Sequence, residues 1–138
     1  MTENEKYALV QKALSARKMS YSPYSGFAVG AALMTSDEEI YTGANIESAS
    51  YSPTVCAERV AFFSAVHKGE RSFKSIAIVG GKSDSDVKDF TAPCGVCRQV
   101  MAEFCDADFE IILYNGNEMK TYSLSELFPE SFGKSNLK

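Results

Sequence analysis

The chain has 138 residues, of which 45% are hydrophobic and 23% are charged, and its formal net charge is −4. This length and apolar content exclude a disordered chain and predict one compact domain over residues 1–138. The acidic balance, with no block of Lys or Arg, argues against nucleic-acid binding and favours a small-molecule partner. Residues 1–18 lack the apolar core of a signal peptide, and no run approaches the roughly 18 apolar residues of a membrane span. We therefore expect a cytoplasmic protein with no membrane partner.

The first half of the chain predicts a helix, a hairpin and a second helix. Apolar residues recur at helical spacing within a charged segment, which predicts an amphipathic helix over residues 3–18. After a loop rich in Ser and Pro, two strands are expected at residues 27–35 and 39–44, joined by a short turn. Cys56 opens a segment without a helix breaker until Gly69, which predicts a buried helix.

The second half continues the alternation of strands and helices. The pattern predicts a buried strand at residues 75–79, a helix at 94–103, strands at 109–114 and 118–122, and a short helix from Ser123. Parallel strands need crossover connections, so strands that alternate with helices indicate a mixed sheet with helices on both faces. The sequence pattern therefore predicts an α/β fold without a domain break.

Three features lack the partners that ligand binding would require. Residues 80–83, Gly-Gly-Lys-Ser, end like a phosphate-binding loop, but Ile76 stands where its first glycine belongs. The aspartates of residues 84–89 lack the turn glycine and distal glutamate of a calcium loop. His67 is the only histidine, so no metal cluster of several histidines can form, and we expect it at a helix end.

The clearest chemical signal is a set of three cysteines. Cys56 precedes Ala and Glu, whereas Cys94 and Cys97 form a Cys-x-x-Cys that begins a predicted helix after Pro93. In an intracellular chain, cysteines serve as metal ligands or thiols more often than as disulfides. Three thiolates leave the fourth tetrahedral position of zinc open for water, which is the layout of a catalytic site. The sequence therefore predicts one Zn²⁺ per chain, with Cys105 outside the ligand set.

Such a site needs charge compensation, because three thiolates make the metal centre negative. The predicted helices begin at the cysteines, so their positive dipole ends face the sulfurs. Arg59 follows Cys56 by three residues and lies on the same helical face. We expect its guanidinium to donate to a zinc-bound sulfur.

Glu58 is the predicted catalytic residue. Zinc-dependent base deaminases combine a three-cysteine site with a glutamate that does not bind the metal and a downstream Pro-Cys-x-x-Cys. Glu58 occupies that place after Cys56. We expect zinc-bound hydroxide to attack C4, while Glu58 carries protons to the ring nitrogen and to the leaving amine.

Further blocks of sequence resemble the cytidine deaminase family. The first comprises residues 21–25, Tyr-Ser-Pro-Tyr-Ser, and residues 27–33, Phe-Ala-Val-Gly-Ala-Ala-Leu. The second is Gly-Ala-Asn-Ile-Glu at residues 43–47, so with the zinc motifs the resemblance extends from Tyr21 to Phe132. It implies hydrolysis of free cytidine and deoxycytidine to uridine, deoxyuridine and ammonia, a reaction of pyrimidine salvage.

The same resemblance implies a fold and a set of substrate contacts. Members of this family are three-layer α/β/α sandwiches around a five-stranded mixed sheet. The resemblance implies that Asn45 and Glu47 hold the ribose hydroxyls, and that Phe27 and Ala57 contact the substrate. Amide and carboxylate groups make directional bonds to a diol, and an apolar cleft suits an aromatic neighbour of the pyrimidine.

The small members of the family are homotetramers whose subunits complete one another's active sites, and this chain is similar to them. Ala49 and Tyr51 match loop positions near a neighbouring site. Residues 127–132, Leu-Phe-Pro-Glu-Ser-Phe, resemble the terminal block of the family. We therefore expect an exposed apolar ending that a neighbour covers, with Phe132 contributing to a site on another subunit.

Two alternatives remain open from the sequence. A structural zinc module for protein or nucleic-acid binding would use all four cysteines, including Cys105, and would not need Glu58. A deaminase of a blasticidin-type antibiotic or of a polynucleotide base would keep the zinc chemistry. The pair Asn45 and Glu47 favours a simple ribose ligand, and the acidic charge disfavours nucleic acid.

Overall fold

The computed structural model describes residues 1–137. Its helices are α1 (Glu3–Arg17), α2 (Ala57–His67), α3 (Gly95–Phe104), α4 (Leu124–Leu127) and a 3₁₀ helix (Lys134–Leu137). Its strands are β1 (Phe27–Thr35), β2 (Ile40–Ala44), β3 (Phe73–Lys82), β4 (Glu110–Tyr114) and β5 (Met119–Ser123). Every predicted helix and strand is confirmed, although β3 extends beyond the predicted strand at both ends. Within residues 1–137, no helix combines the length and apolar character that crossing a membrane requires.

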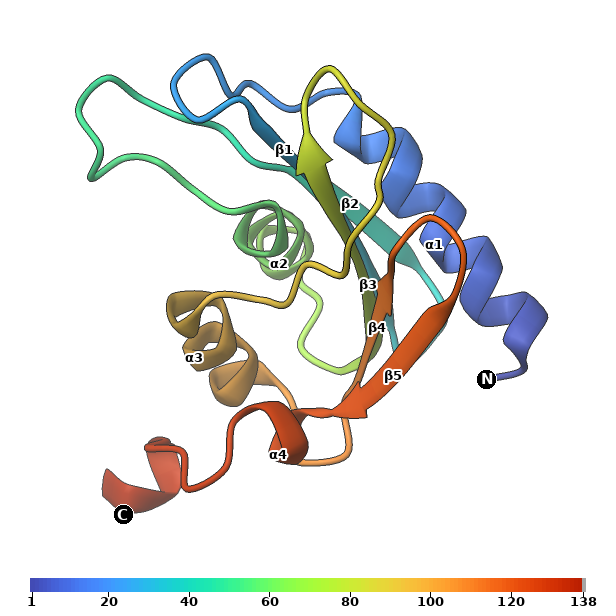
Figure 1. Cartoon of the computed structure of the whole chain (residues 1–138). Coiled ribbons are helices and arrows are strands. Elements are labelled where there is room, and N and C mark those ends of the chain that lie inside the picture. Colours follow the sequence, from blue (N-terminus) through green and yellow to red (C-terminus); the bar gives the residue numbers. More distant parts are fainter. Residues whose placement is uncertain (138) are drawn as a thin grey trace.

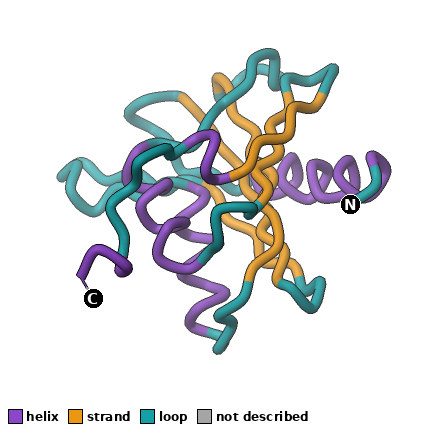
Figure 2. Tube along the Cα trace, turned by 90° about the horizontal axis from the view of Figure 1, so that it is seen from below, coloured by secondary structure: helices purple, strands orange, loops and turns teal. Residues whose placement is uncertain are grey.

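The five strands form one mixed sheet in the order β2-β1-β3-β4-β5. β3 and β4 are parallel, and the other neighbouring strands are antiparallel. Figure 1 shows α1 on one face of this sheet and α2 and α3 on the other. The view from below in Figure 2 shows the same arrangement, with the strands between the two groups of helices. The predicted α/β/α sandwich is therefore confirmed.

The side chains of the central strands alternate between the two faces of the sheet, so the hydrophobic core forms two clusters. Ile76 and Ile78 belong to the cluster beneath α2 and α3, which also contains the buried Phe62. Ala77 and Val79, on the opposite face of β3, belong to the cluster beneath α1. Because successive side chains of a strand point to opposite faces, one run of apolar residues fills both layers. This double burial anchors the central strands that support the site.

Gly43 sets the distance between β2 and α2. A Cβ at this position would lie 2.4 Å from the carbonyl oxygen of Ala57 and 2.7 Å from the nitrogen of Ala61. Strand and helix therefore approach each other with no side chain between them. This close approach fixes the first turn of α2, which carries Cys56 at its N-cap and Glu58.

Gly43→Ala should lower the free energy of unfolding by about 1–3 kcal/mol, because the new methyl group must displace the backbone of α2. Thermal unfolding followed by circular dichroism should show a melting temperature about 3–10 °C lower. Gly133→Ala is the control, since a Cβ there meets nothing within 4 Å. Equal melting temperatures for the two variants would show that α2 shifts without cost.

Candidate active site

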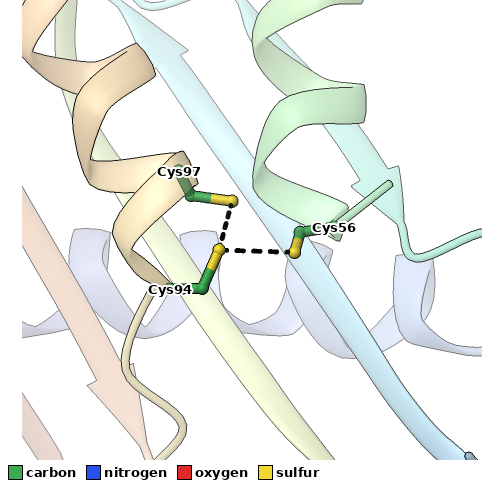
Figure 3. Close-up of side chains that lie close together, drawn as sticks. All are labelled: Cys56, Cys94 and Cys97. Carbon is green, nitrogen blue, oxygen red and sulfur yellow. Dashed lines mark hydrogen bonds between the residues drawn. The ribbon is translucent and has the colours of Figure 1, made fainter. Parts of the chain in front are cut away.

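Three cysteine sulfurs meet where α2 and α3 begin. Cys56 is the N-cap of α2, Cys94 is the N-cap of α3, and Cys97 lies in the first turn of α3. The Sγ of Cys94 lies 3.6 Å from that of Cys56 and 3.5 Å from that of Cys97. All three sulfurs lie within 4.8 Å of one another and point toward a common centre (Figure 3). Cys105 lies at the other end of α3, outside this cluster.

The local backbone explains why these sulfurs are free to meet. Cys56 and Cys94 both have an extended backbone, with ψ angles of 155° and 169°, and neither side chain caps its own helix. The thiols therefore project away from their helices and toward each other. Each helix N-terminus also carries a partial positive charge, which favours thiolates.

The cluster favours deprotonation of Cys56. Hydrogen bonds from the Cys97 thiol and from Arg59 lower the pKa of Cys56 to about 5. The Nη2 of Arg59 donates to the Sγ of Cys56 at 3.5 Å, as the sequence predicts. The contact with Cys56 raises the pKa of Cys97, so Cys56 is the first of the pair to lose its proton. The buried Nε of Arg59 has no partner within residues 1–137, so a donor remains beside the cluster for further negative charge.

The cluster fits the zinc ion that the sequence predicts. Thiolates are soft ligands that bind zinc well, and the lowered pKa of Cys56 supplies one near neutral pH. The unpartnered Nε of Arg59 suits a ligand set that becomes more negative when the other thiols lose their protons. Three protein ligands also leave one tetrahedral position open, as a catalytic zinc requires.

Glu58 lies in the first turn of α2 and is only 4% exposed. Burial, and after it the negative charge of Cys56, raises the pKa of the Glu58 carboxyl to about 7. A carboxyl with this pKa can hold or release a proton at neutral pH, which is what a general acid or base needs.

A cavity of about 310 Å³ opens onto Cys56, Cys94 and Glu58. Six of the predicted site residues line it: Phe27, Asn45, Glu47, Cys56, Glu58 and Cys94. The first three come from the start of β1 and the segment after β2, and the others from the starts of α2 and α3. The start of β1, the segment after β2 and the two helix N-termini thus border one space of nucleoside size.

Glu47 is held as a carboxylate by the loop before β1. Its Oε1 accepts hydrogen bonds from the backbone nitrogens of Tyr24 and Ser25, both at 3.0 Å. Its Oε2 accepts from the Ser25 hydroxyl. The hydrogen bonds from Ser25, followed by that from Tyr24, lower the pKa of Glu47. Ser25 also lines the cavity, although the sequence does not single it out.

Six predicted residues do not line this cavity: Cys97 and Arg59 belong to the cysteine cluster, and the other four are Ala49, Tyr51, Ala57 and Phe132. Ala57 is fully buried, so its side chain contributes to the core rather than to the cavity wall. Ala49 is exposed in the loop before α2, where Tyr51 is 78% exposed and borders a neighbouring hollow with Glu47. Phe132 is 59% exposed on the C-terminal segment.

The expectation of a fully exposed apolar ending is wrong for two residues. Leu127 and Phe128 are partly buried and pack against the core cluster beneath α2 and α3. They do so because α4 follows β5 directly and contacts both β5 and α3. Of the apolar ending, Pro129 and Phe132 remain exposed.

Arg98 is a structural link of the site that the sequence does not reveal. Its Nε donates to the carbonyl oxygen of Pro93 at 2.7 Å, and its Nη1 donates to that of Leu127. The next residue, Gln99, donates from Nε2 to the carbonyl oxygen of Phe132 at 2.8 Å. Together they join the turn before α3 to the C-terminal segment. The only signal in the sequence is the position of Arg98 beside a metal ligand.

Comparisons with known proteins agree with this geometry. Residues 3–113 match the family model described as "Cytidine and deoxycytidylate deaminase zinc-binding region". A cytidine deaminase from Sporosarcina psychrophila is 45% identical over 130 residues, which cover 94% of this chain and 92% of that protein. The solved structure of a cytidine deaminase from Burkholderia pseudomallei is 42% identical with a TM-score of 0.85, and the match covers 96% of this chain and 100% of that one. With its cysteine triad, its buried glutamate and this likeness over nearly its whole length, the chain belongs to the cytidine deaminase family.

Proposed function

We propose that this protein hydrolyses free cytidine and deoxycytidine to uridine and deoxyuridine, with release of ammonia, in pyrimidine salvage. The observation that carries the proposal is one cavity lined both by Cys56 and Cys94 of the cysteine cluster and by the buried Glu58. Hydrolytic deamination requires an activated water and a group that moves protons, and these two features can supply them.

Cys56, Cys94 and Cys97 would hold one zinc ion per chain. When bound, zinc supplies the Lewis acidity that makes a water molecule reactive at neutral pH. Arg59 would stabilise the thiolates, because its guanidinium already donates to Cys56. Cys105 is an unsuitable fourth ligand, since it lies at the far end of α3 and burial raises the pKa of its thiol. This position disfavours a structural zinc module that uses all four cysteines.

Glu58 would carry the protons of the reaction. Its carboxylate accepts a proton from the attacking water and delivers a proton to N3 of the pyrimidine. It then takes the second proton of that water, from the hydroxyl group now on C4, and delivers it to the amino group as the bond between C4 and that nitrogen breaks. The water oxygen becomes the C4 oxygen of uridine, and the amino group leaves as ammonia. A pKa of about 7 matches this double role, because proton uptake and release are then both accessible.

Phe27, Asn45 and Glu47 would position the nucleoside. The ring of Phe27 is 40% exposed at the cavity and offers an apolar surface to the pyrimidine. Asn45 and Glu47 offer an amide and a carboxylate to the ribose hydroxyls. Ala57 would contribute through its backbone, because its side chain is buried.

We infer that the chain acts as a homotetramer with shared active sites. Large apolar side chains are exposed at Met19, Ile46, Tyr51 and Phe132. Met19 and Ile46 also border an apolar hollow of about 240 Å³ beside β2, an edge strand of the sheet. Surfaces of this kind are typical of subunit interfaces. The cytoplasmic location and the action of residues 1–138 as one domain stay predictions.

Cys56→Ala should abolish zinc binding, because it removes one of the three ligands. Cys105→Ala is the matched control and should keep one zinc per chain. Metal analysis of the purified proteins by mass spectrometry distinguishes the two variants. The assignment of the ligands fails when Cys105→Ala loses zinc and Cys56→Ala retains it.

Glu58→Gln should bind zinc and fold normally but lose turnover of cytidine by about 10³-fold or more, because the amide cannot cycle protons. Glu103→Gln, an exposed position on α3, should keep normal turnover. The loss of cytidine absorbance gives the rate, and chromatographic identification of uridine confirms the product. Near-normal turnover by Glu58→Gln would contradict the proposed role.

Truncation after Pro129 should raise KM and weaken subunit assembly together, because it removes Phe132. Phe132→Ala should reproduce the effect, whereas Leu137→Ala, which removes another exposed apolar side chain, should not. Multi-angle light scattering and steady-state kinetics test this prediction, with zinc content expected to stay unchanged. A fully active monomer, from either the full-length or the truncated chain, would rule out shared sites.

A further inference from the structure

Most hydrogen-bonding positions of the Asn45 side-chain amide are occupied by other groups of the protein. Asn45 is 8% exposed and lies immediately after β2, beside the start of β1. Its Nδ2 donates to the carbonyl oxygen of Phe27 at 2.8 Å, and its Oδ1 accepts from the backbone nitrogen of Val29 at 2.9 Å. A backbone N–H can only donate and a carbonyl can only accept, so these two bonds fix which way the amide faces.

Ser20 supplies the remaining bond to this amide. Its Oγ lies 2.5 Å from the Oδ1 of Asn45 and 3.1 Å from the Oγ of Ser22. A carbonyl oxygen cannot donate, so the single hydroxyl proton of Ser20 points to Asn45 and Ser22 donates to Ser20. The hydrogen bonds of such a chain strengthen one another. Both lone pairs of Oδ1 are therefore occupied.

Asn45 is left with one N–H to offer to a ligand, and Glu47 offers only acceptor oxygens. A hydroxyl group suits this pair, because it can accept from Asn45 and donate to Glu47 at the same time. We propose that Ser20 is a positioning residue for the recognition of the ribose hydroxyls, holding the Asn45 amide so that its free N–H serves the cavity. This inference rests on the proposed hydrolysis of nucleosides, and it adds a residue outside the cavity wall to the determinants of substrate binding.

Ser20 acts on binding more than on the chemical step. It lies between α1 and β1 and is not among the residues that line the cavity with Glu58. Removing its hydroxyl leaves one lone pair of a buried amide without a partner and loosens the rotation of that amide. The hydrogen bond from Val29 to Asn45 remains, so the site keeps its shape while its affinity for the ribose falls.

Ser20→Ala should lower kcat/KM for cytidine by about 3- to 10-fold, the effect of losing one such hydrogen bond, and most of the loss should appear in KM. Ser20→Thr keeps a hydroxyl and should restore most of the loss. Ser15→Ala changes an exposed serine of α1 and should behave as the wild-type protein. Circular dichroism should show the same far-UV spectrum for all four proteins, with Ser20→Ala melting a few degrees lower because a buried acceptor loses its partner, and all four folded at the assay temperature.

A second substrate separates positioning from a general structural effect. 2′,3′-Dideoxycytidine lacks the 2′ and 3′ hydroxyls and keeps only the 5′ hydroxyl, so Ser20→Ala and wild-type protein should turn it over at equal rates. An equal loss on both substrates would overturn the inference, and so would unchanged kinetics of Ser20→Ala with cytidine. If the wild-type protein does not convert cytidine, the proposed function itself fails and the inference falls with it. Normal wild-type turnover beside an unaffected Ser20→Ala overturns the role of Ser20 alone.

Discussion

The site exists only because two helices from different parts of the chain begin at the same point. α2 follows β2 and α3 follows β3, yet the sulfurs of their N-cap cysteines lie 3.6 Å apart. The closeness of Gly43 to α2 fixes the position of one helix. The bond from Arg98 to the turn before α3 fixes the other. The cavity, the metal ligands and the proposed proton carrier all depend on this meeting, because each of them lies at or beside the first turns of the two helices.

Where α2 and α3 begin, the cysteine thiols and the Glu58 carboxyl lie close together, and these groups repel one another when they are negatively charged. The negative charge of Cys56 raises the pKa of the buried Glu58 carboxyl, in addition to the larger effect of burial. Positive counterparts are correspondingly close, with Arg59 bonded to Cys56 and two helix N-termini facing the sulfurs. Strongly shifted pKa values in a cavity are typical of functional sites, and here each shift has an identified cause: chiefly burial for Glu58, and chiefly the hydrogen bond from Cys97 for Cys56. Reactivity at this site therefore follows from where the helices start rather than from unusual residues.

The fold was predictable from the sequence because its signals are local. Gly and Pro punctuate the loops, and the β-rich segments alternate with helical ones, so the order of the elements and the mixed sheet could be inferred. The zinc ligands were predictable for the same reason, since their spacing places them at helix starts. The sequence motif also singled out Glu58, whose catalytic role stays a prediction, and only the structure shows that it is buried.

Long-range contacts account for what the sequence did not predict. The partners of Arg98 are backbone carbonyl oxygens, which every residue possesses, so no residue type marks them. Ser20 lies 25 positions from Asn45 and looks like any loop serine until the fold brings the two together. Leu127 and Phe128 read as an exposed ending, because the sequence does not show that α4 turns back onto the core.

The two ends of the chain differ in what they touch, which matters for attaching an affinity tag or a fusion partner. Met1 packs against the cluster beneath α1, and its sulfur accepts a hydrogen bond from Ser75 at 3.2 Å. This cluster lies on the face of the sheet opposite α2 and α3 (Figure 1). The C-terminal segment is instead held by α3, the helix that carries two of the cysteines, through the bond from Gln99 to Phe132. A protein fused to the N-terminus would disturb the face of the sheet that α1 covers. One fused to the C-terminus would disturb the contacts of α3, the helix that carries two of the metal ligands.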